Sequence, residues 1–313
     1  MFAVTGSAGR FGRLALAAVL DLTADRTGTA TATATATATV ALTRDPVRAG
    51  ADPGRPGLSV RQADFARPAT LPPALAGVRR LLLVSTERSP RRLRLHEAAV
   101  EAAVAAGVEH VVYTSVVRAA DPANPVPEAA DHGRTERLLA GSGLAHTVLR
   151  FNVWPQMLLL TGLARLAVAH GELPSSAAHG RVGYITREDT AWAAARVLTG
   201  AVDAVPAPGT TGTVLDVTGP GLTDAEVAAA LGAATGRPVR HRPVADADVP
   251  GALTALGVPP ALAAGWGGND PFRRQGWFDV PDDGTTRRLL GRDPVTLGAF
   301  FAAHRPELLA GTP

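Results

Sequence analysis

Three glycines near the start of the chain, Gly6, Gly9 and Gly12, restrict the fold more than any other feature of the sequence. They follow a short apolar run, and an amphipathic segment from Arg13 to Leu20 comes directly after them. This order predicts a strand, a tight turn and a helix N-terminus, which together can hold the pyrophosphate of a dinucleotide. The alternative is a tight strand-to-helix turn that binds no ligand.

The spacing gives each glycine a separate task. Gly6 should permit the turn, Gly9 should let the backbone approach a phosphate, and Gly12 should let the helix pack closely on the strand. We expect the whole segment to contact the cofactor: Gly6, Ser7, Ala8, Gly9, Arg10, Phe11 and Gly12.

The composition excludes several other classes of protein. All 31 basic residues are arginine, because the sequence contains no lysine, and they are scattered among 28 acidic residues. The resulting net charge of +3 argues against a basic patch for nucleic acid. The absence of cysteine excludes disulfides, thiol catalysis and cysteine-based metal sites, and no metal site is predicted.

The most apolar stretch, Val148 to Ala169, is interrupted by polar residues and a proline, so we read it as a core strand leading into a helix. A membrane span needs a longer uninterrupted apolar run. The first residues already read as a buried strand, which leaves no signal peptide, and a cytoplasmic location is expected.

Predicted strands alternate with predicted helices through residue 150, and several strands are continuously apolar. This pattern is typical of an α/β protein with a doubly wound parallel-sheet Rossmann fold. We predict an NADP-binding Rossmann domain over residues 1–152 and a smaller, interleaved C-terminal substrate lobe over residues 153–313. Strands near 182–185 and 213–217 are candidates to return to the first domain. The Thr-Ala alternation from Thr29 to Thr39 is predicted to be an extended or disordered surface insertion.

Residues after the second and third strands bear on the cofactor. Arg44 lies where an adenosine ribose is expected, and an arginine there can pair with a 2′-phosphate and select NADP(H). The alternative is a solvated loop arginine, and the adjacent Asp45 weakens the assignment. Asp64 and Phe65 are predicted to flank the adenine; alternatively they are a helix cap and a core aromatic residue.

Polar residues also end the next strands, and the ligand crevice of an open α/β sheet lies at these strand ends. Ser85 and Thr86 follow the fourth strand, Tyr113 and Ser115 end the fifth, and Phe151 and Asn152 end the sixth. We expect these positions to surround the nicotinamide and the substrate. Ordinary strand-end polarity is the alternative at each.

Because there is no lysine, the Tyr-x-x-x-Lys pair common in short-chain dehydrogenases cannot exist here. The helix at that place carries His132 and, one turn later, Glu136. We predict that His132 donates a proton and that Glu136 holds it in position. The alternative is a surface helix start with Asp131 as its cap.

Several segments recur in one order in a known family, and the likeness extends over nearly the whole chain. These segments are Thr5 to Gly12, Leu42 to Pro46, Gln62 to Phe65, Tyr113 to Ser115, Thr135 to Leu139 and Leu149 to Asn152. Together they resemble the NmrA-like group of atypical short-chain dehydrogenases, and within it most of all the bacterial NADPH:quinone oxidoreductases.

The resemblance implies an NADPH-binding Rossmann lobe, a small substrate lobe and a cleft between them, with Arg44 meeting the 2′-phosphate. The family's usual Thr-Glu-Lys is Thr-Glu-Arg here, so Arg137 replaces a lysine and is a poor proton donor.

Two functions compete at this point. The first is reduction of quinones or similar small-molecule electron acceptors with NADPH, which tolerates a missing Tyr/Lys pair. The second is a non-catalytic, NADP(H)-sensing regulatory protein that binds a protein partner, as some NmrA-like relatives do. A sugar-nucleotide epimerase or dehydratase is a weaker third. Homodimer formation is left open.

Overall fold

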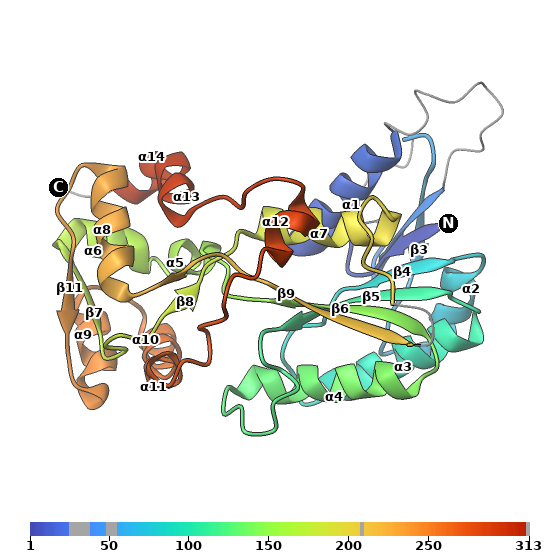
Figure 1. Cartoon of the computed structure of the whole chain (residues 1–313), viewed down its shortest axis with the longest axis horizontal. Helices are drawn as coiled ribbons and strands as arrows, with labels where there is room; N and C mark the ends of the chain where they lie inside the picture. The colour runs from blue at the N-terminus through green and yellow to red at the C-terminus, as the bar shows by residue number, and fades with distance from the viewer. Residues whose placement is uncertain (25–37, 48–54, 207–209, 311–313) are drawn as a thin grey trace.

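A seven-stranded parallel sheet forms the centre of the computed structural model, which describes residues 1–24, 38–47, 55–206 and 210–310 (Figure 1). Its strand order is β3-β2-β1-β4-β5-β6-β9, and every neighbouring pair is parallel. The strands are β1 (Phe2–Val4), β2 (Thr39–Thr43), β3 (Leu58–Gln62), β4 (Arg80–Leu83), β5 (His110–Val116), β6 (Ala145–Phe151) and β9 (Gly212–Val217). This is the doubly wound order with its reversal between β1 and β4, so the predicted Rossmann fold is confirmed.

Helices cover both faces of this sheet (Figure 1). On one face α1 (Arg10–Ala24) packs against α7 (Arg187–Thr199), and α12 (Thr285–Leu290) packs against α7 in turn. The other face is covered by α2 (Leu71–Leu75), α3 (Arg92–Ala105) and α4 (Pro127–Gly141). Two apolar cores therefore lie above and below the sheet, and the residues of β1, β2, β4, β5 and β6 are nearly all buried, as expected for a parallel sheet covered on both sides. The edge strands β3 and β9 are more exposed.

A second lobe has its own apolar core and two short two-stranded sheets, one of β8 with β10 and one of β7 with β11. Its strands are β7 (Glu172–Ser175), β8 (Val182–Gly183), β10 (Gly221–Leu222) and β11 (Arg240–Pro243). Its helices are α5 (Gln156–Leu160), α6 (Leu163–His170), α8 (Asp224–Thr235), α9 (Val249–Ala255), α10 (Pro260–Gly267), α11 (Asp270–Arg274), α13 (Leu297–Ala303) and α14 (Arg305–Leu309). Two 3₁₀ helices are also present: Pro68–Thr70 precedes α2, and Asp246–Asp248 precedes α9. Thr223 and Glu226 form the predicted capping box at the start of α8.

The two later segments proposed as returning strands are placed differently. β9 pairs with β6 at the edge of the main sheet, whereas β8 pairs antiparallel with β10 in the second lobe. β8 is only two residues long, which is too short a ladder to extend a parallel sheet. The boundary between residues 152 and 153 stays a prediction, and most of the Thr-Ala alternation lies outside the described residues.

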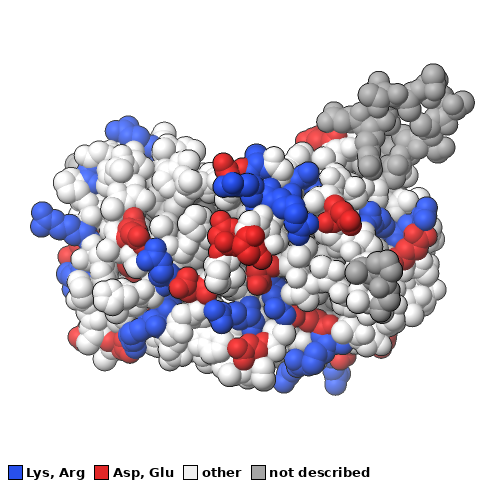
Figure 2. Space-filling view, viewed as in Figure 1, with Lys and Arg blue, Asp and Glu red and all other residues white. Residues whose placement is uncertain are grey.

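Charged side chains are interspersed on the face drawn in Figure 2, where arginines lie among aspartates and glutamates. Within the described parts of the chain, no helix combines the length and the apolar character that crossing a membrane requires.

Candidate active site

A cavity of about 1360 Å³ lies at the carboxyl ends of the parallel strands, between the sheet and the second lobe. The residues that follow β1, β2, β3 and β4 line it, as do the ends of β5 and β6. The second lobe contributes residues of α10, α11 and the segment after α11. This is the crevice at which open α/β sheets bind their ligands.

The glycine turn forms one end of the cavity, and its backbone geometry explains the glycines. Gly6 has a φ of +60°, a conformation that side chains with a Cβ rarely adopt. A Cβ on Gly12 would lie 2.1 Å from the carbonyl oxygen of Gly6, so only glycine lets α1 start this close to the turn. A Cβ on Gly9 would lie 3.2 Å from the same oxygen, at a position that lines the cavity.

Six of the seven predicted residues of this segment line the cavity. They are Gly6, Ala8, Gly9, Arg10, Phe11 and Gly12. Ser7 differs: it is buried, and both its backbone N–H and its hydroxyl donate to the carbonyl of Leu42, at 3.1 Å each. Ser7 thus ties the turn to β2 instead of facing a ligand.

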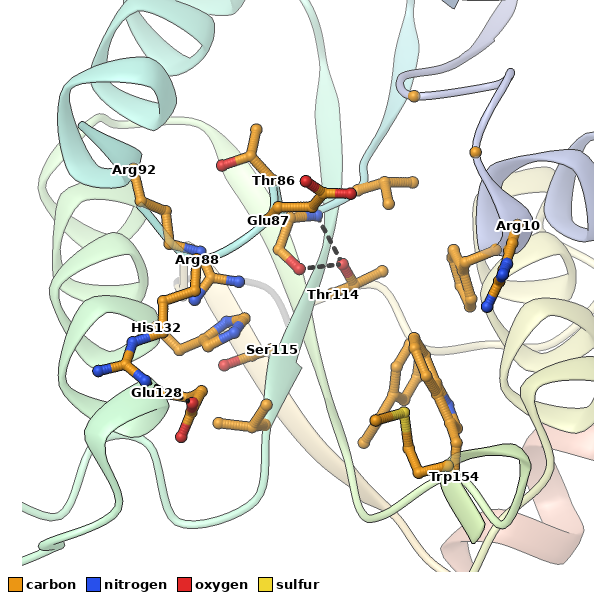
Figure 3. Close-up of a pocket in the computed structure, with 18 of the residues that line it drawn as sticks. Arg10, Thr86, Glu87, Arg88, Arg92, Thr114, Ser115, Glu128, His132 and Trp154 are labelled. Atoms are coloured by element: carbon orange, nitrogen blue, oxygen red, sulfur yellow. Dashed lines mark hydrogen bonds and ion pairs between the residues drawn. The ribbon is translucent and has the colours of Figure 1, made fainter. Parts of the chain in front are cut away.

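The bare turn, the N-terminus of the 15-residue helix α1 and the Arg10 side chain fit the pyrophosphate of a dinucleotide. Figure 3 shows Arg10 on the α1 side of the cavity, with Trp154 below it. The guanidinium of Arg187 lies 4.7 Å from the centre of the Trp154 ring, and burial lowers its pKa, with Arg10 contributing.

The predicted adenine end also lies along the cavity. Arg44, Asp64 and Phe65 all line it. Asp64 accepts a hydrogen bond from Nε of Arg67 at 2.8 Å. Burial opposes ionisation of Asp64, but bonds from Arg67 and from the N–H of Ala66 outweigh it and lower the pKa of the carboxyl group.

Ser85 and Thr86 line the middle of the cavity beside β5. The N–H of Ser85 donates to Oγ1 of Thr114 at 2.8 Å, and the N–H of Thr86 donates to Nε2 of His96 at 3.1 Å. The dashed lines from Thr114 in Figure 3 mark its two hydrogen bonds to Ser85, and the hydroxyl of Thr114 donates to that of Ser85 at 3.3 Å. Backbone groups of the loop after β4 are therefore fixed by side chains of the neighbouring elements.

His132 lines the cavity, but the predicted hydrogen bond with Glu136 is not formed, because each of the two side chains has another partner. Its Nδ1 and the hydroxyl oxygen of Tyr113 form a hydrogen bond of 2.9 Å. Burial lowers the pKa of His132 well below its usual value, with Arg92 and His96 contributing, so the imidazole is neutral at physiological pH. A neutral imidazole carries no extra proton to donate, so this shift argues against the predicted donor role of His132, which stays a prediction.

Tyr113 lies behind this wall instead of in the cavity, because its ring is completely buried in the core under α3. Burial raises the pKa of its hydroxyl group. Its position therefore suits orientation of His132 and not direct contact with a substrate.

Glu136 pairs with a residue that the sequence did not single out as its partner. Its carboxylate accepts hydrogen bonds from Nη2 and Nε of Arg150 at 2.6 and 3.0 Å. The hydroxyl of Ser115, which lines the cavity, donates to the same carboxylate at 2.6 Å. α4 starts at Pro127, so Asp131 lies inside the helix, and the alternative of Asp131 as its cap is wrong. Arg137 is exposed on the same helix.

Phe151 and Asn152 line the cavity where the chain leaves the sheet. Phe151 packs against Phe11, with ring centres 5.6 Å apart. Asn152 donates to the hydroxyl of Thr218 at 3.0 Å and to the carbonyl of Phe278 at 2.9 Å. Asn152 thereby joins β6 to segments of the second lobe.

Sequence reasoning missed the residues that close the cavity from the second lobe, from the start of α3 and from the start of α7. The aromatic ones are Tyr184, Trp266, Trp277 and Phe278; the basic ones are Arg92, Arg187 and Arg273. Arg92 lies in the run Arg91-Arg92-Leu93-Arg94, which resembles a solvated face. However, Arg92, His96, Ala99, Val100 and Ala103 share the buried stripe of α3, and that spacing was a readable signal.

Fold and site together define a dinucleotide-binding oxidoreductase of the Rossmann type, and the comparisons agree. Residues 24–200 match the model of a family described as NAD(P)H-binding, and the chain belongs to this family.

Relatives over the whole length support the same assignment. Quinone oxidoreductase 2 of Escherichia coli (strain K12) is 33% identical over 299 residues, which cover 95% of this chain and 96% of that protein. The NAD(P)H azoreductase of Xenophilus azovorans is 35% identical and covers 84% of this chain and 88% of its own. The crystal structure of the E. coli NADPH-dependent quinone oxidoreductase QOR2, complexed with NADPH, superposes with a TM-score of 0.79 at 33% identity, covering 97% of this chain and 99% of that one. The predicted family resemblance is confirmed, and the chain is an NAD(P)H-dependent oxidoreductase.

Proposed function

We propose that this protein reduces quinones or similar small-molecule acceptors with NADPH. The observation that carries the proposal is a glycine cradle that opens into one large cavity, closed on its far side by aromatic side chains of the second lobe. A flat aromatic acceptor fits such a wall. Support also comes from the two full-length relatives, one a quinone oxidoreductase and the other an azoreductase.

When bound, the nicotinamide supplies a hydride, and the chain's own residues bind and orient the cofactor and the acceptor. The glycine turn and Arg10 hold the pyrophosphate, while Phe11, Phe151 and Trp154 form an apolar side of the cavity. Ser115 is fixed by Glu136 and can donate no second proton, since its only hydroxyl proton is used. We therefore assign proton delivery to water, with neutral His132 as a polar contact.

Preference for NADPH over NADH is assigned to Arg44. It lines the cavity just after β2, where the adenosine ribose belongs. A guanidinium can bind a 2′-phosphate through two parallel hydrogen bonds. The 2′-hydroxyl of NADH offers it no comparable partner.

The test is direct. Purified protein is mixed with NADPH and a panel of benzoquinones and naphthoquinones, and the loss of NADPH absorbance is followed. We expect acceptor-dependent oxidation that is faster with NADPH than with NADH. No oxidation across the panel, together with tight NADPH binding, would instead favour the sensing regulator.

Two further assignments belong with this proposal. A cytoplasmic location is part of this proposal, and it agrees with the use of NADPH. A homodimer or a regulatory protein partner stays open to measurement by light scattering and by pull-down.

A further inference from the structure

Arg92 stands out among the arginines that line the cavity. It is the first residue of α3, its side chain is only 6% exposed, and it reaches the cavity. Neither Nε nor Nη1 of its guanidinium has a hydrogen-bond partner. Within the residues that the structure describes, Arg92 forms no ion pair either.

In the described part of the chain, the surroundings of Arg92 supply no negative charge that pairs with its guanidinium. Its positive charge helps to lower the pKa of both His96 and His132, and these two neighbours are neutral. Arg88 lies on the same side of the cavity and uses its guanidinium on Glu128, 3.2 Å away (Figure 3). Glu128 is therefore already paired with Arg88.

A buried guanidinium without a partner is costly, because it loses hydration and gains no bond in return. Such a guanidinium is expected where a ligand supplies the missing negative charge and hydrogen-bond acceptors. Guanidinium presents a planar fork of N–H donors that matches a carboxylate or sulfonate.

The cofactor's phosphates do not account for this charge. The glycine turn and Arg10 lie on the α1 side of the cavity, while Arg92 enters from α3 on the opposite side, with Thr114 between them (Figure 3). Arg92 shares its side with His132, across from the cradle.

We propose that Arg92 is the anion-binding residue of the acceptor subsite, and that the preferred acceptors are aromatic compounds carrying a sulfonate or carboxylate. The aromatic body lies against the second-lobe residues Trp266, Trp277 and Phe278, which line the same cavity. The inference rests on the proposed function in taking the ligand to be an acceptor.

The experiment measures binding without turnover. Naphthalene-2-sulfonate and its neutral isostere naphthalene-2-sulfonamide are titrated calorimetrically into protein saturated with NADP⁺. We expect the sulfonate to bind about tenfold tighter or more, since a hydrogen-bonded charge contributes at least that factor. Arg92→Gln should remove this preference. Arg94→Gln is the matched control, because Arg94 is exposed on the same helix and does not line the cavity.

Several results would overturn the inference: equal binding of the two probes to the unchanged protein, no binding of either, or a preference that survives Arg92→Gln. A parallel loss of NADPH affinity in that variant would overturn it too, by moving Arg92 to the cofactor site. If Arg92→Gln does not fold, Arg92→Lys is titrated, and the preference should fall because the fork is lost. A protein that bound the sulfonate through Arg92 but reduced no quinone would contradict the proposed function alone.

Discussion

At the scale of single residues, the two proposals assign two arginines of the cavity to two kinds of ligand. Arg44 lies after β2 and Arg92 begins α3, so they line different parts of one space. In a chain without lysine every cationic contact is made by a planar fork, which favours anions that accept two parallel bonds.

Replacing Arg44 should separate the two nicotinamide cofactors. Arg44→Ala is expected to weaken NADPH binding by about 10- to 100-fold, because a hydrogen-bonded charge pair is lost, and to leave NADH nearly unchanged. Fluorescence titration with each cofactor measures both constants. Arg13→Ala is the control, since Arg13 is exposed on α1 and does not line the cavity. Equal losses for the two cofactors would remove Arg44 from the phosphate site.

His132 should leave no mark on the pH profile of turnover. Burial lowers its pKa well below the ordinary value, so it stays neutral and does not change charge between about pH 6 and pH 8. We expect a flat kcat for quinone reduction over this range. A step near the ordinary histidine pKa that vanishes in His132→Gln would show that the imidazole titrates and donates its proton after all.

Replacing Arg92 should stabilise the folded protein. Arg92→Met keeps an apolar side chain of similar length and removes a buried charge without a partner. We expect the free energy of unfolding to rise by about 1 kcal/mol or more. Thermal unfolding without ligands measures this change. A clear loss of stability would indicate that the guanidinium supports the fold itself.

Site residues were predictable where their place follows from the backbone pattern. They were less predictable where their role depends on which side chains they contact. The glycine turn and Arg44 follow from position relative to strands. The partner of Glu136 could not be predicted from the sequence, because Arg150 lies on β6, which only the folded sheet brings beside α4. Helical spacing suggested His132 as that partner, yet a tertiary contact with Tyr113 replaced it.

At the scale of elements, the junction between the turn and α1 is the most crowded place in the site. Gly12→Ala would set a Cβ 2.1 Å from the Gly6 carbonyl oxygen, and we expect a loss of about 2 kcal/mol in unfolding free energy. Denaturant unfolding measures it. Gly141→Ala is the control: Gly141 ends α4 with open space around it, so that variant should be neutral or slightly more stable.

Gly9 tests function in the same turn. A Cβ there meets the Gly6 oxygen at 3.2 Å, which a small shift can relieve. Gly9→Val should therefore fold and lose cofactor affinity, because its side chain fills the space a phosphate needs. Retained NADPH binding in this variant would place the phosphates elsewhere.

Elements with a strong local pattern were predicted well, and the second lobe less so. Continuous apolar runs gave the strands through β6, and a capping box gave α8. The pairing of β8 could not be predicted, because a two-residue strand carries no periodicity to say which sheet it joins.

At the scale of the whole molecule, buried histidines couple stability to pH. Burial lowers the pKa of His96 and of His110 to about 4. In each ring a nitrogen accepts a bond: His96 from the N–H of Thr86, and His110 from Arg80 at 3.2 Å. Between pH 4 and 6.5 the unfolded chain binds more protons than the folded one, so stability rises with pH over this interval and falls on acidification.

Across this interval, the free energy of unfolding is expected to change by about 3 kcal/mol for each histidine. Denaturant unfolding at a series of pH values measures it. His110→Gln should reduce this change by about 3 kcal/mol and leave the contribution of His96. His179→Gln is the control, because His179 is exposed. A stability curve that is level across this interval in the unchanged protein would contradict the prediction.

The chain returns from the second lobe to the first one twice: α7 and β9 return together, to α1 and β6, and α12 returns later, to α7. Neither lobe is therefore one continuous stretch of sequence. A fragment ending after β6 would leave the edge of that strand and the apolar face of α1 open to water, which invites aggregation. Acceptor specificity in this enzyme consequently cannot be exchanged by fusing a foreign C-terminal half to residues 1–152. It has to be changed within the intact chain, one cavity residue at a time.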